Sequence, residues 1–339
     1  MTSPPTVEAP DPASAPPVRW GIVGVGWMAD KFANGVNDLT RSTVAAACSR
    51  SLDRAQAFAK GHDVARAYDS VDDLVADPEV DVVHVASPHS EHRAHALAAI
   101  AAGKHVLVEK AFARNEAEAK EVVDAARAAG VFAMEAMWTR FLPHVIEIKR
   151  TIARGDLGRV VSLEADHGQW FEFNPASRLF NPALAGGALL DLGVYPVSFA
   201  HDLLGVPETV AAVGQMTETG VDGQVSVVLG YGERAQATIY TTLWSATPCT
   251  AVISGTEGRI EIDGHFYAPT SYRVIRRDGM TWNAEARVPN GYAYEAAEVA
   301  RRISAGETES PAMTLEETLE VMRTLDEVRR QIGLAYPGE

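Results

Sequence analysis

The sequence predicts two domains, an N-terminal α/β domain on a doubly wound parallel sheet and a C-terminal α+β domain with a large, predominantly antiparallel open sheet. Three observations lead to this prediction. The 339 residues exceed what a single hydrophobic core comfortably holds. From Val18 to Ala136, short apolar runs alternate with amphipathic ones. Beyond Gly205, short strand-like runs follow one another with turn residues between them.

The first domain is predicted to span residues 18–138, and residues 1–17, rich in Pro, Ala and Ser, are expected to form a disordered tail. Asn115 and Glu118 have the spacing of a capping box, which starts a helix that ends at Gly130. Strands that alternate with helices in this way are typical of a parallel sheet. The expected strands are residues 20–23, 44–47, 81–86, 105–108 and 131–136.

The second domain is predicted to span residues 139–339. Residues 186–204 have a helical pattern that is disturbed at Gly193 and Pro196, because proline removes a backbone N–H. The remaining elements include about six strands between residues 210 and 276, and two helices at residues 294–305 and 315–332.

The charge balance excludes some partners. The formal net charge of −15 argues against nucleic acid or an anionic membrane, because both need a basic face. We expect no membrane span and no secretory signal. The two cysteines, Cys48 and Cys249, cannot build a disulfide framework, and nothing near them has metal-ligand spacing. We therefore expect a cytoplasmic protein without a metal site.

A glycine motif follows the first predicted strand. Gly24 permits a tight turn, and Gly26 lets the backbone approach a pyrophosphate. Trp27 and Met28 begin the helix whose N-terminus would face that negative charge. Alone, the motif also fits a merely structural turn. At the start of a β/α alternation it predicts a dinucleotide-binding Rossmann domain.

The residues after the second strand favour NADP(H) over NAD(H). An NAD enzyme usually has Asp or Glu at this position, whereas this chain has Ser49 and Arg50, with Arg54 one turn into the next helix. Arg50 can stack on the adenine and pair with a 2′-phosphate, and Arg54 adds positive charge. The alternative is a pair of solvated surface arginines.

Two further segments end predicted strands, where ligands bind in this architecture. In the first, Ser87, Pro88, His89 and His92 are expected to line the nicotinamide ribose or to cap the helix. The two histidines lack a third residue at the right spacing for a metal site. The second segment is Glu109–Ala111.

Motifs spread along the chain resemble those of the glucose–fructose oxidoreductase, inositol dehydrogenase and rhizopine-catabolism family. Within that family, several stretches are similar to the branch that contains dimeric dihydrodiol dehydrogenase and NADP-dependent D-xylose dehydrogenase. Their order and spacing carry the resemblance more than any single motif does. The motifs are Gly24-x-Gly26, Glu109-Lys110 and residues 191–196 for the family, and residues 134–141, 185–190, 294–296 and 309–311 for the branch.

The resemblance implies that Lys110 and Tyr195 carry the chemistry and that Asp191 orients the substrate. Hydride transfer from an alcohol carbon leaves a hydroxyl proton that needs an acceptor. An unperturbed phenol has a pKa of about 10, and a neighbouring lysine would lower it. We assign Tyr195 as acid/base and Lys110 as its electrostatic partner, with Asp191 four residues before Tyr195 on one helix face. The alternative makes Tyr195 a core aromatic residue and Lys110 a surface cation.

One residue departs from the family pattern, which is usually Glu-Lys-Pro. This chain has Ala111 where the family has proline. Proline would fix the turn that aims the lysine and can allow a cis bond, whereas a cis bond before alanine costs about 3 kcal/mol. The sequence therefore constrains the aim of Lys110 less than the family pattern does.

Aromatic and arginine side chains are expected to contact the substrate. Trp138 and Arg140 lie at the predicted domain junction, and Trp170, Phe171 and Arg178 follow in a loop of the second domain. An aromatic wall with few charges suits a pyranose ring or a cyclic diol better than an anionic metabolite. Either tryptophan could instead fill the core.

These observations predict an NADP-dependent dehydrogenase of an aldose such as D-xylose, or of a trans-dihydrodiol. One alternative is a sugar 3-ketoreductase that works on a free or nucleotide-linked sugar with the same lysine and tyrosine. An alternative from another class is a non-catalytic NADP-binding sensor. Because an open sheet face must be buried, and the family buries it against a second subunit, we expect a homodimer through the C-terminal sheet.

Overall fold

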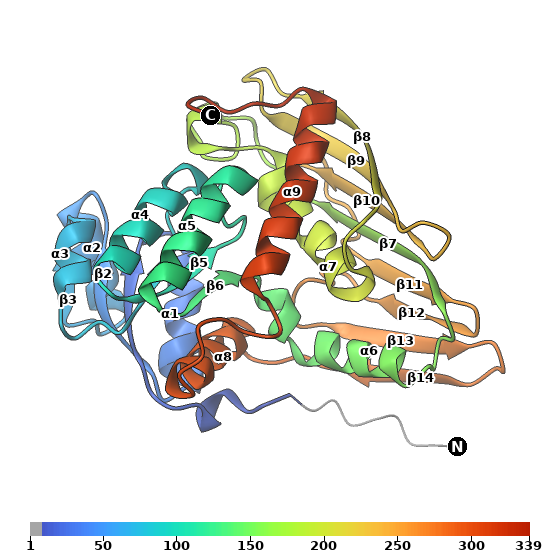
Figure 1. Cartoon of the computed structure of the whole chain (residues 1–339), viewed down its shortest axis with the longest axis horizontal. Helices are drawn as coiled ribbons and strands as arrows, with labels where there is room; N and C mark the ends of the chain where they lie inside the picture. Colours follow the sequence, from blue (N-terminus) through green and yellow to red (C-terminus); the bar gives the residue numbers. More distant parts are fainter. Residues whose placement is uncertain (1–8) are drawn as a thin grey trace. The chain divides into compact units, whose positions relative to one another are not determined.

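The computed structural model describes residues 9–339, which form two compact units (Figure 1). The first, called here the Rossmann unit, contains Pro10–Trp138 and Asn290–Met322. The second, called the sheet unit, contains Thr139–Pro289 and Arg323–Glu339.

The Rossmann unit is built on a six-stranded parallel sheet, which confirms the predicted doubly wound fold. Its strands are largely buried, as expected when helices cover both faces. The short β3 was not expected from the sequence. In spatial order, the strands are β3 (Arg66–Tyr68), β2 (Thr43–Cys48), β1 (Arg19–Val23), β4 (Val82–Val85), β5 (His105–Glu109) and β6 (Ala133–Ala136).

Six helices belong to this unit. α4 and α5 pack side by side, and α1 packs against α8 (Figure 1). The N-cap half of the expected capping box is present, because the Asn115 side chain accepts from the backbone N–H of Glu118 at 2.9 Å, and the Glu118 carboxylate accepts from the backbone N–H of Arg114 at 3.2 Å. The helices are α1 (Trp27–Leu39), α2 (Leu52–Gly61), α3 (Val71–Ala76), α4 (His89–Ala101), α5 (Glu116–Ala129) and α8 (Tyr292–Ser304).

Two segments belong elsewhere than the sequence analysis places them. Part of the expected tail forms a 3₁₀ turn, Pro12–Ser14, which contacts α8, and Arg301 donates to the Asp11 carbonyl at 2.7 Å. Residues 1–8 lie outside the described residues. Asn290–Met322, assigned above to the second domain, packs with the Rossmann unit. Local patterns could not show this, because the contacts join residues far apart in the chain.

The sheet unit contains an eight-stranded sheet in which only β7 and β10 pair in parallel, which confirms the predominantly antiparallel prediction. Two strands exceed the expected six, because β7 joins the sheet and β14 had no clear signal. In spatial order, the strands are β14 (Thr281–Glu285), β13 (Ser271–Arg276), β12 (Gly258–Ile262), β11 (Ala251–Gly255), β7 (Val160–Gly168), β10 (Gln236–Thr242), β9 (Asp222–Gly230) and β8 (Thr209–Met216).

Helices cover one face of this sheet. Figure 1 shows α6 (Pro143–Ala153), α7 (Val194–Leu204) and the last turns of α9 (Leu315–Ile332) on that side. The disturbance expected at Gly193 is a π turn, Leu189–Gly193, which leads directly into α7.

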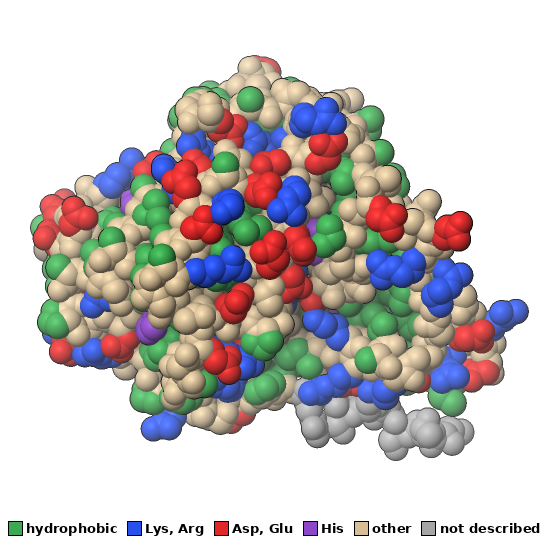
Figure 2. Space-filling view, viewed as in Figure 1, with side chains coloured by type: hydrophobic (Ala, Val, Ile, Leu, Met, Phe, Trp, Pro, Cys, Tyr) green, Lys and Arg blue, Asp and Glu red, His purple; other side chains and the backbone are tan. Residues whose placement is uncertain are grey.

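One segment passes a membrane-span test by length and composition, although the sequence analysis expected none. Pro182–Leu204 has a mean hydropathy of 1.4 in its most apolar window, but 89% of that window is buried inside the structure. Such burial is typical of a core helix. On the face that Figure 2 shows, acidic and basic side chains are interspersed, without one continuous basic surface.

Candidate active site

The loop between β1 and α1 has the features that a pyrophosphate needs. Gly24 has a φ of +95°, and a Cβ there would lie 2.6 Å from the Ala86 carbonyl oxygen, so only glycine fits. A Cβ at Gly26 would meet nothing within 4 Å. Gly26 is also the N-cap of α1, so no side chain caps the first N–H groups. Trp27 is 67% exposed, whereas the Met28 sulfur lies 3.7 Å from a tyrosine hydroxyl of α8.

The end of β2 presents two arginines to solvent. Ser49 donates its N–H to the Tyr68 carbonyl at 3.1 Å, which fixes the strand end. Arg50 and Arg54 are exposed, and among residues 9–339 neither side chain has a hydrogen-bond or ion-pair partner. Their charges are therefore available to a ligand, and a 2′-phosphate suits them. The residues of this unit thus fit a phosphate-bearing dinucleotide.

Two histidines in the segment after β4 contact the backbone of the segment after β5. His89 Nε2 lies 3.2 Å from the Lys110 carbonyl oxygen. His92 lies with Nδ1 3.0 Å from the Ala111 carbonyl oxygen and with Nε2 2.8 Å from that of Ser87. Burial lowers the pKa of His92 to about 3, so the ring is neutral and donates to one of the two carbonyls. Pro88 is the N-cap of α4. These histidines hold backbone in place.

Lys110 follows the last residue of β5 and is only 9% exposed, so it is not a surface cation. Glu109 is also buried, and its Oε1 lies 3.1 Å from His84 Nε2. The Lys110–Ala111 peptide bond is cis. Trp138, in the same unit, is 6% exposed and stacks on Tyr292 with ring centroids 4.2 Å apart.

In the sheet unit, Asp191 and Arg178 form an ion pair. Asp191 lies in the π turn and is 5% exposed, and its Oδ1 accepts from Arg178 Nη1 at 2.7 Å. The Arg178 side chain is 52% exposed. Asp191 lies in the π turn Leu189–Gly193, and Tyr195 follows four residues later in the first turn of α7.

Tyr195 lies in α7, is 6% exposed and packs in a cluster of rings. Its ring centroid lies 5.3 Å from that of His167 and 4.9 Å from that of Tyr267. His167 Nδ1 lies 3.1 Å from the Leu192 carbonyl oxygen, so Nδ1 carries the proton and Nε2 can accept from the Gln169 amide at 3.0 Å. The same amide lies 3.2 Å from the Tyr267 hydroxyl, whose pKa is raised by burial.

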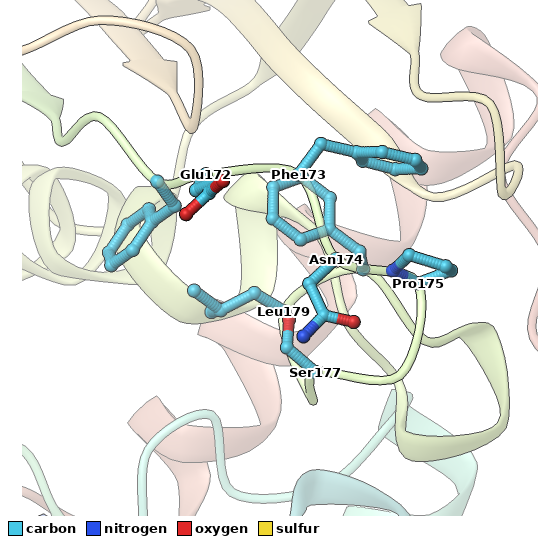
Figure 3. A pocket seen from close by; sticks show the side chains of 8 residues that line it. Glu172, Phe173, Asn174, Pro175, Ser177 and Leu179 are labelled. Atoms are coloured by element: carbon cyan, nitrogen blue, oxygen red, sulfur yellow. The ribbon is translucent and has the colours of Figure 1, made fainter.

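A loop beside this cluster encloses a cavity of about 500 Å³ (Figure 3). Phe171 lines it, and Trp170 is 65% exposed, so Trp170 does not fill the core. Phe173 packs edge-on against Phe180 with centroids 5.1 Å apart. In Figure 3, Asn174 and Ser177 place polar groups beside these apolar side chains.

Arg140 was expected to contact substrate, but the structure gives its donors to α7. It is 3% exposed, and its guanidinium donates to Ser198 Oγ at 3.2 Å and to the Ser198 carbonyl at 3.3 Å. Asp202 lies 3.8 Å away. A substrate contact of Arg140 therefore stays a prediction, and the contacts with α7 are ones that the sequence around Arg140 could not show.

Sequence reasoning missed three residues around Tyr195, namely His167, Gln169 and Tyr267. His167 and Gln169, at the end of β7, received no role from the sequence. Tyr267 had no sequence signal, because it reaches the cluster from a loop that is remote in the chain. In the part of the chain that the structure describes, no group of three or more His, Cys, Asp or Glu side chains is arranged to hold a metal ion.

Comparisons with known proteins decide the family. Residues 18–137 match a family model described as an oxidoreductase family with an NAD-binding Rossmann fold, and residues 145–261 match the GFO/IDH/MocA C-terminal domain. A trans-1,2-dihydrobenzene-1,2-diol dehydrogenase of Sus scrofa is 37% identical over 334 residues, which cover 95% of this chain and 99% of that protein. The chain belongs to the GFO/IDH/MocA oxidoreductase family.

Further similarity lies within the same class of enzymes. A D-xylose 1-dehydrogenase (NADP(+)) of Hypocrea jecorina is 33% identical over 365 residues, which cover 94% of this chain and 93% of that protein. A solved aldose–aldose oxidoreductase from Caulobacter crescentus, complexed with glycerol, has a TM-score of 0.83 and 25% identity, and covers 93% of this chain and 97% of its own. This GFO/IDH/MocA protein is therefore an oxidoreductase with an NAD(P)-binding Rossmann unit.

Proposed function

We propose that this oxidoreductase uses NADP(H) to transfer a hydride to or from a hydroxyl-bearing carbon of a neutral cyclic substrate, an aldose such as D-xylose or a trans-dihydrodiol. The observation that carries the proposal is the buried Tyr195 phenol on the same segment as an Asp191 carboxylate that Arg178 neutralises. A matched pair of charges favours hydroxyl groups over an anionic ligand, since neither charge is left to bind a counter-charge. The names of the two curated relatives agree with a diol or an aldose.

Proton transfer is the task of this chain's own residues. A nicotinamide dinucleotide, when bound, supplies or accepts the hydride. Oxidation of an alcohol also releases the hydroxyl proton, and we assign Tyr195 to accept it and, in the reverse direction, to return it. We assign Lys110 to favour the ionised phenol, because a nearby positive charge lowers a phenol pKa. Asp191, with Arg178, would orient a substrate hydroxyl.

The choice of NADP(H) rests on Arg50 and Arg54. Both are exposed and unpaired in the described chain, and they follow the strand end at which a carboxylate would select NAD(H). Ser49 adds a hydroxyl beside them. A relative whose name specifies NADP(+) supports the same choice.

Asp191, Tyr195 and Arg178 are called here the substrate half-site. The aromatic rings near them suit a cyclic ligand. Phe171 lines the loop cavity and Trp170 is largely exposed, so both can offer an apolar face to a sugar or diol ring. Trp138, which stacks on Tyr292 in the Rossmann unit, is assigned to the substrate as well.

A homodimer through the open face of the eight-stranded sheet completes the proposal. Val225 and Val227 of β9 are buried on the helix-covered side, whereas Val228 of the same strand is 43% exposed and Val213 of β8 is 72% exposed. A sheet face with exposed apolar side chains is a natural interface. A cytoplasmic location accords with this enzyme class and is part of the same proposal.

Two steps test the function. Fluorescence titration with NADPH and NADH measures cofactor affinity, and the exposed Trp27 beside the glycine loop provides a reporter. A panel of aldoses and trans-dihydrodiols with NADP⁺, and of 3-keto sugars with NADPH, then measures turnover. We expect turnover of an aldose or a diol. Turnover of keto sugars alone would favour the 3-ketoreductase, and tight NADPH binding without any turnover would favour the sensor and overturn the proposal.

A further inference from the structure

The buried carboxylate of Asp222 contacts the start of the segment that carries Asp191 and Tyr195. It is the first residue of β9 and is fully buried. Its Oδ2 accepts from the backbone N–H of Leu189 at 2.7 Å, and the nearby backbone N–H of Ala188 favours the charged form of the carboxyl. The first N–H groups of a helical segment lack partners within that segment, so a carboxylate there satisfies them and interacts favourably with the helix dipole.

The chain just before this segment passes directly over the carboxylate. Gly187 has a φ of +121°, and a Cβ there would overlap Asp222 Oδ1. At Gly186, a Cβ would lie 2.5 Å from the Leu179 carbonyl oxygen. The Tyr336 hydroxyl donates to the Gly186 carbonyl at 2.6 Å. The two-glycine turn is therefore fixed on several sides, and Asp222 fixes the point where it becomes helical.

The position of this point matters for the substrate half-site. Asp191 comes two residues after the N–H that Asp222 receives, and its ion pair with Arg178 is short, at 2.7 Å. A movement at Leu189 would move the Asp191 carboxylate away from that partner. Further along the same segment, the Arg140 guanidinium donates hydrogen bonds to the hydroxyl and the carbonyl of Ser198. The segment is thus attached before Asp191 and after Tyr195.

We propose that Asp222 is a positioning residue of the substrate half-site, which places the Asp191 carboxylate and the Tyr195 phenol by accepting the Leu189 N–H at the start of their segment. The inference rests on the proposed function of those two residues. Loss of Asp222 lowers kcat and raises KM for the substrate. It leaves the Kd for NADPH unchanged, because the residues proposed to bind the dinucleotide belong to the Rossmann unit.

The test compares Asp222→Asn, which keeps one acceptor oxygen, with Asp222→Ala, which keeps none. Asp166→Asn is the matched control, since Asp166 also receives two backbone N–H groups, those of Cys249 and Thr250 at 2.7 and 3.0 Å, in the same unit but outside the segment. We expect kcat/KM to fall about a hundredfold in Asp222→Ala, as misplaced reacting groups do, and less in Asp222→Asn. The control retains kcat/KM close to that of the wild type.

A second readout does not depend on turnover. Hydrogen–deuterium exchange of peptides covering residues 186–195 becomes faster in Asp222→Ala and stays unchanged in Asp166→Asn. If the wild type turns over no substrate, the proposed function fails, and the exchange result alone decides whether Asp222 fixes the segment. Unchanged exchange in Asp222→Ala, or faster exchange with unaltered kcat and KM, overturns the inference. If Asp222→Ala does not fold, the same criteria apply to Asp222→Asn.

Discussion

Arg50 is the residue on which the choice of dinucleotide depends most. Its guanidinium is exposed at the end of β2, next to Ser49 and one turn before Arg54. Of the two arginines, it is the one nearer to the strand end, where the ribose of a dinucleotide binds in this architecture. Its removal should therefore separate binding of the two cofactors.

We expect Arg50→Ala to weaken NADPH binding by about tenfold or more, because a charge-assisted bond to phosphate is lost at an exposed site. NADH, which has no 2′-phosphate, should bind almost as before. Arg41→Ala is the matched control, since Arg41 is also exposed but precedes β2 rather than following it. Titration of each variant with both cofactors measures the difference, and equal losses for NADPH and NADH would contradict the cofactor assignment.

At this scale, sequence motifs identified candidate residues whose chemical roles stay predictions, but they did not identify the supporting contacts. Lys110 and Asp191 are buried residues at element ends, and their motifs are local. The contact between Asp191 and Arg178 brings two predicted residues together. Arg140 shows the limit, because its role depends on α7, which local sequence around Arg140 does not describe.

The β1–α1 turn is the element on which cofactor binding is expected to depend. Gly24 has a positive φ, and its neighbour across the turn is the backbone of Ala86. Both the conformation and the contact exclude a side chain, so the turn cannot tolerate even alanine without moving β1 relative to the end of β4.

Gly24→Ala should destabilise the protein by about 1–3 kcal/mol, the usual cost of a strained backbone, and should abolish dinucleotide binding. Gly61→Ala, in α2, is the control, because a Cβ there meets nothing within 4 Å. Urea unfolding and NADPH titration check both variants. A Gly24→Ala variant with wild-type stability and affinity would show that this turn is not the binding element.

The start of the π turn predicts a dependence of stability on pH. Burial raises the pKa of Asp222 to about 7, against about 3.9 in an unfolded chain. Three backbone N–H groups and the charge of Arg329 oppose this increase, and Tyr336 also lies close. Between the two pKa values the folded state holds a proton that the unfolded state has released. The contribution of Asp222 to stability is therefore lost as pH rises through this window.

Asp222→Asn removes this contribution, so the free energy of unfolding of the wild type should fall relative to that of Asp222→Asn between about pH 4 and about pH 8. Urea unfolding at several pH values measures the difference, in which other titrating groups cancel. Two parallel curves would show that the carboxylate titrates at its ordinary pKa.

Element by element, the sequence predicted what local patterns determine. The alternation of strands and helices, the N-cap at Asn115 and the disturbance at Gly193 are all present. Local patterns did not reveal that the disturbance is a π turn, since they show where a helix is disturbed but not which hydrogen bonds replace the α-helical ones. They also missed β14, which is an edge strand with only a short alternating pattern.

At the scale of the whole molecule, the open face of the eight-stranded sheet exposes apolar side chains, which favours burial against a partner. The register pairs Ala211 of β8 with Val228 of β9, which places both on the same face. On the opposite face, Val227 and Leu229 are buried under the helices. A second copy of the chain would bury the exposed valines in the same way.

Val228→Glu should convert a dimer into a monomer, because it places a charge on the exposed apolar part of the sheet face. Val206→Glu is the control, since Val206 is 47% exposed but precedes β8 and lies outside the sheet. Sedimentation of both variants and the wild type gives the masses. A monomeric wild type, or a dimeric Val228→Glu variant, would contradict this interface.

The same scale explains which site residues the sequence could not provide. His167 and Tyr267 are far from each other and from Tyr195 in the chain, and tertiary structure brings the three rings together. The assignment of Asn290–Met322 to the Rossmann unit likewise depends on long-range packing. Local motifs identified the proposed reacting groups, and only the tertiary structure shows what surrounds them.

The most direct measurement of the central claim is the turnover rate of Tyr195→Phe at saturating cofactor and substrate, beside Tyr272→Phe. Tyr272 is a buried tyrosine of β13 whose hydroxyl has no partner among the described residues, so its removal should leave kcat unchanged. If Tyr195 transfers the proton, Tyr195→Phe lowers kcat by about 10²–10⁴ and keeps the Kd for NADPH. A Tyr195→Phe enzyme as fast as Tyr272→Phe would contradict the account.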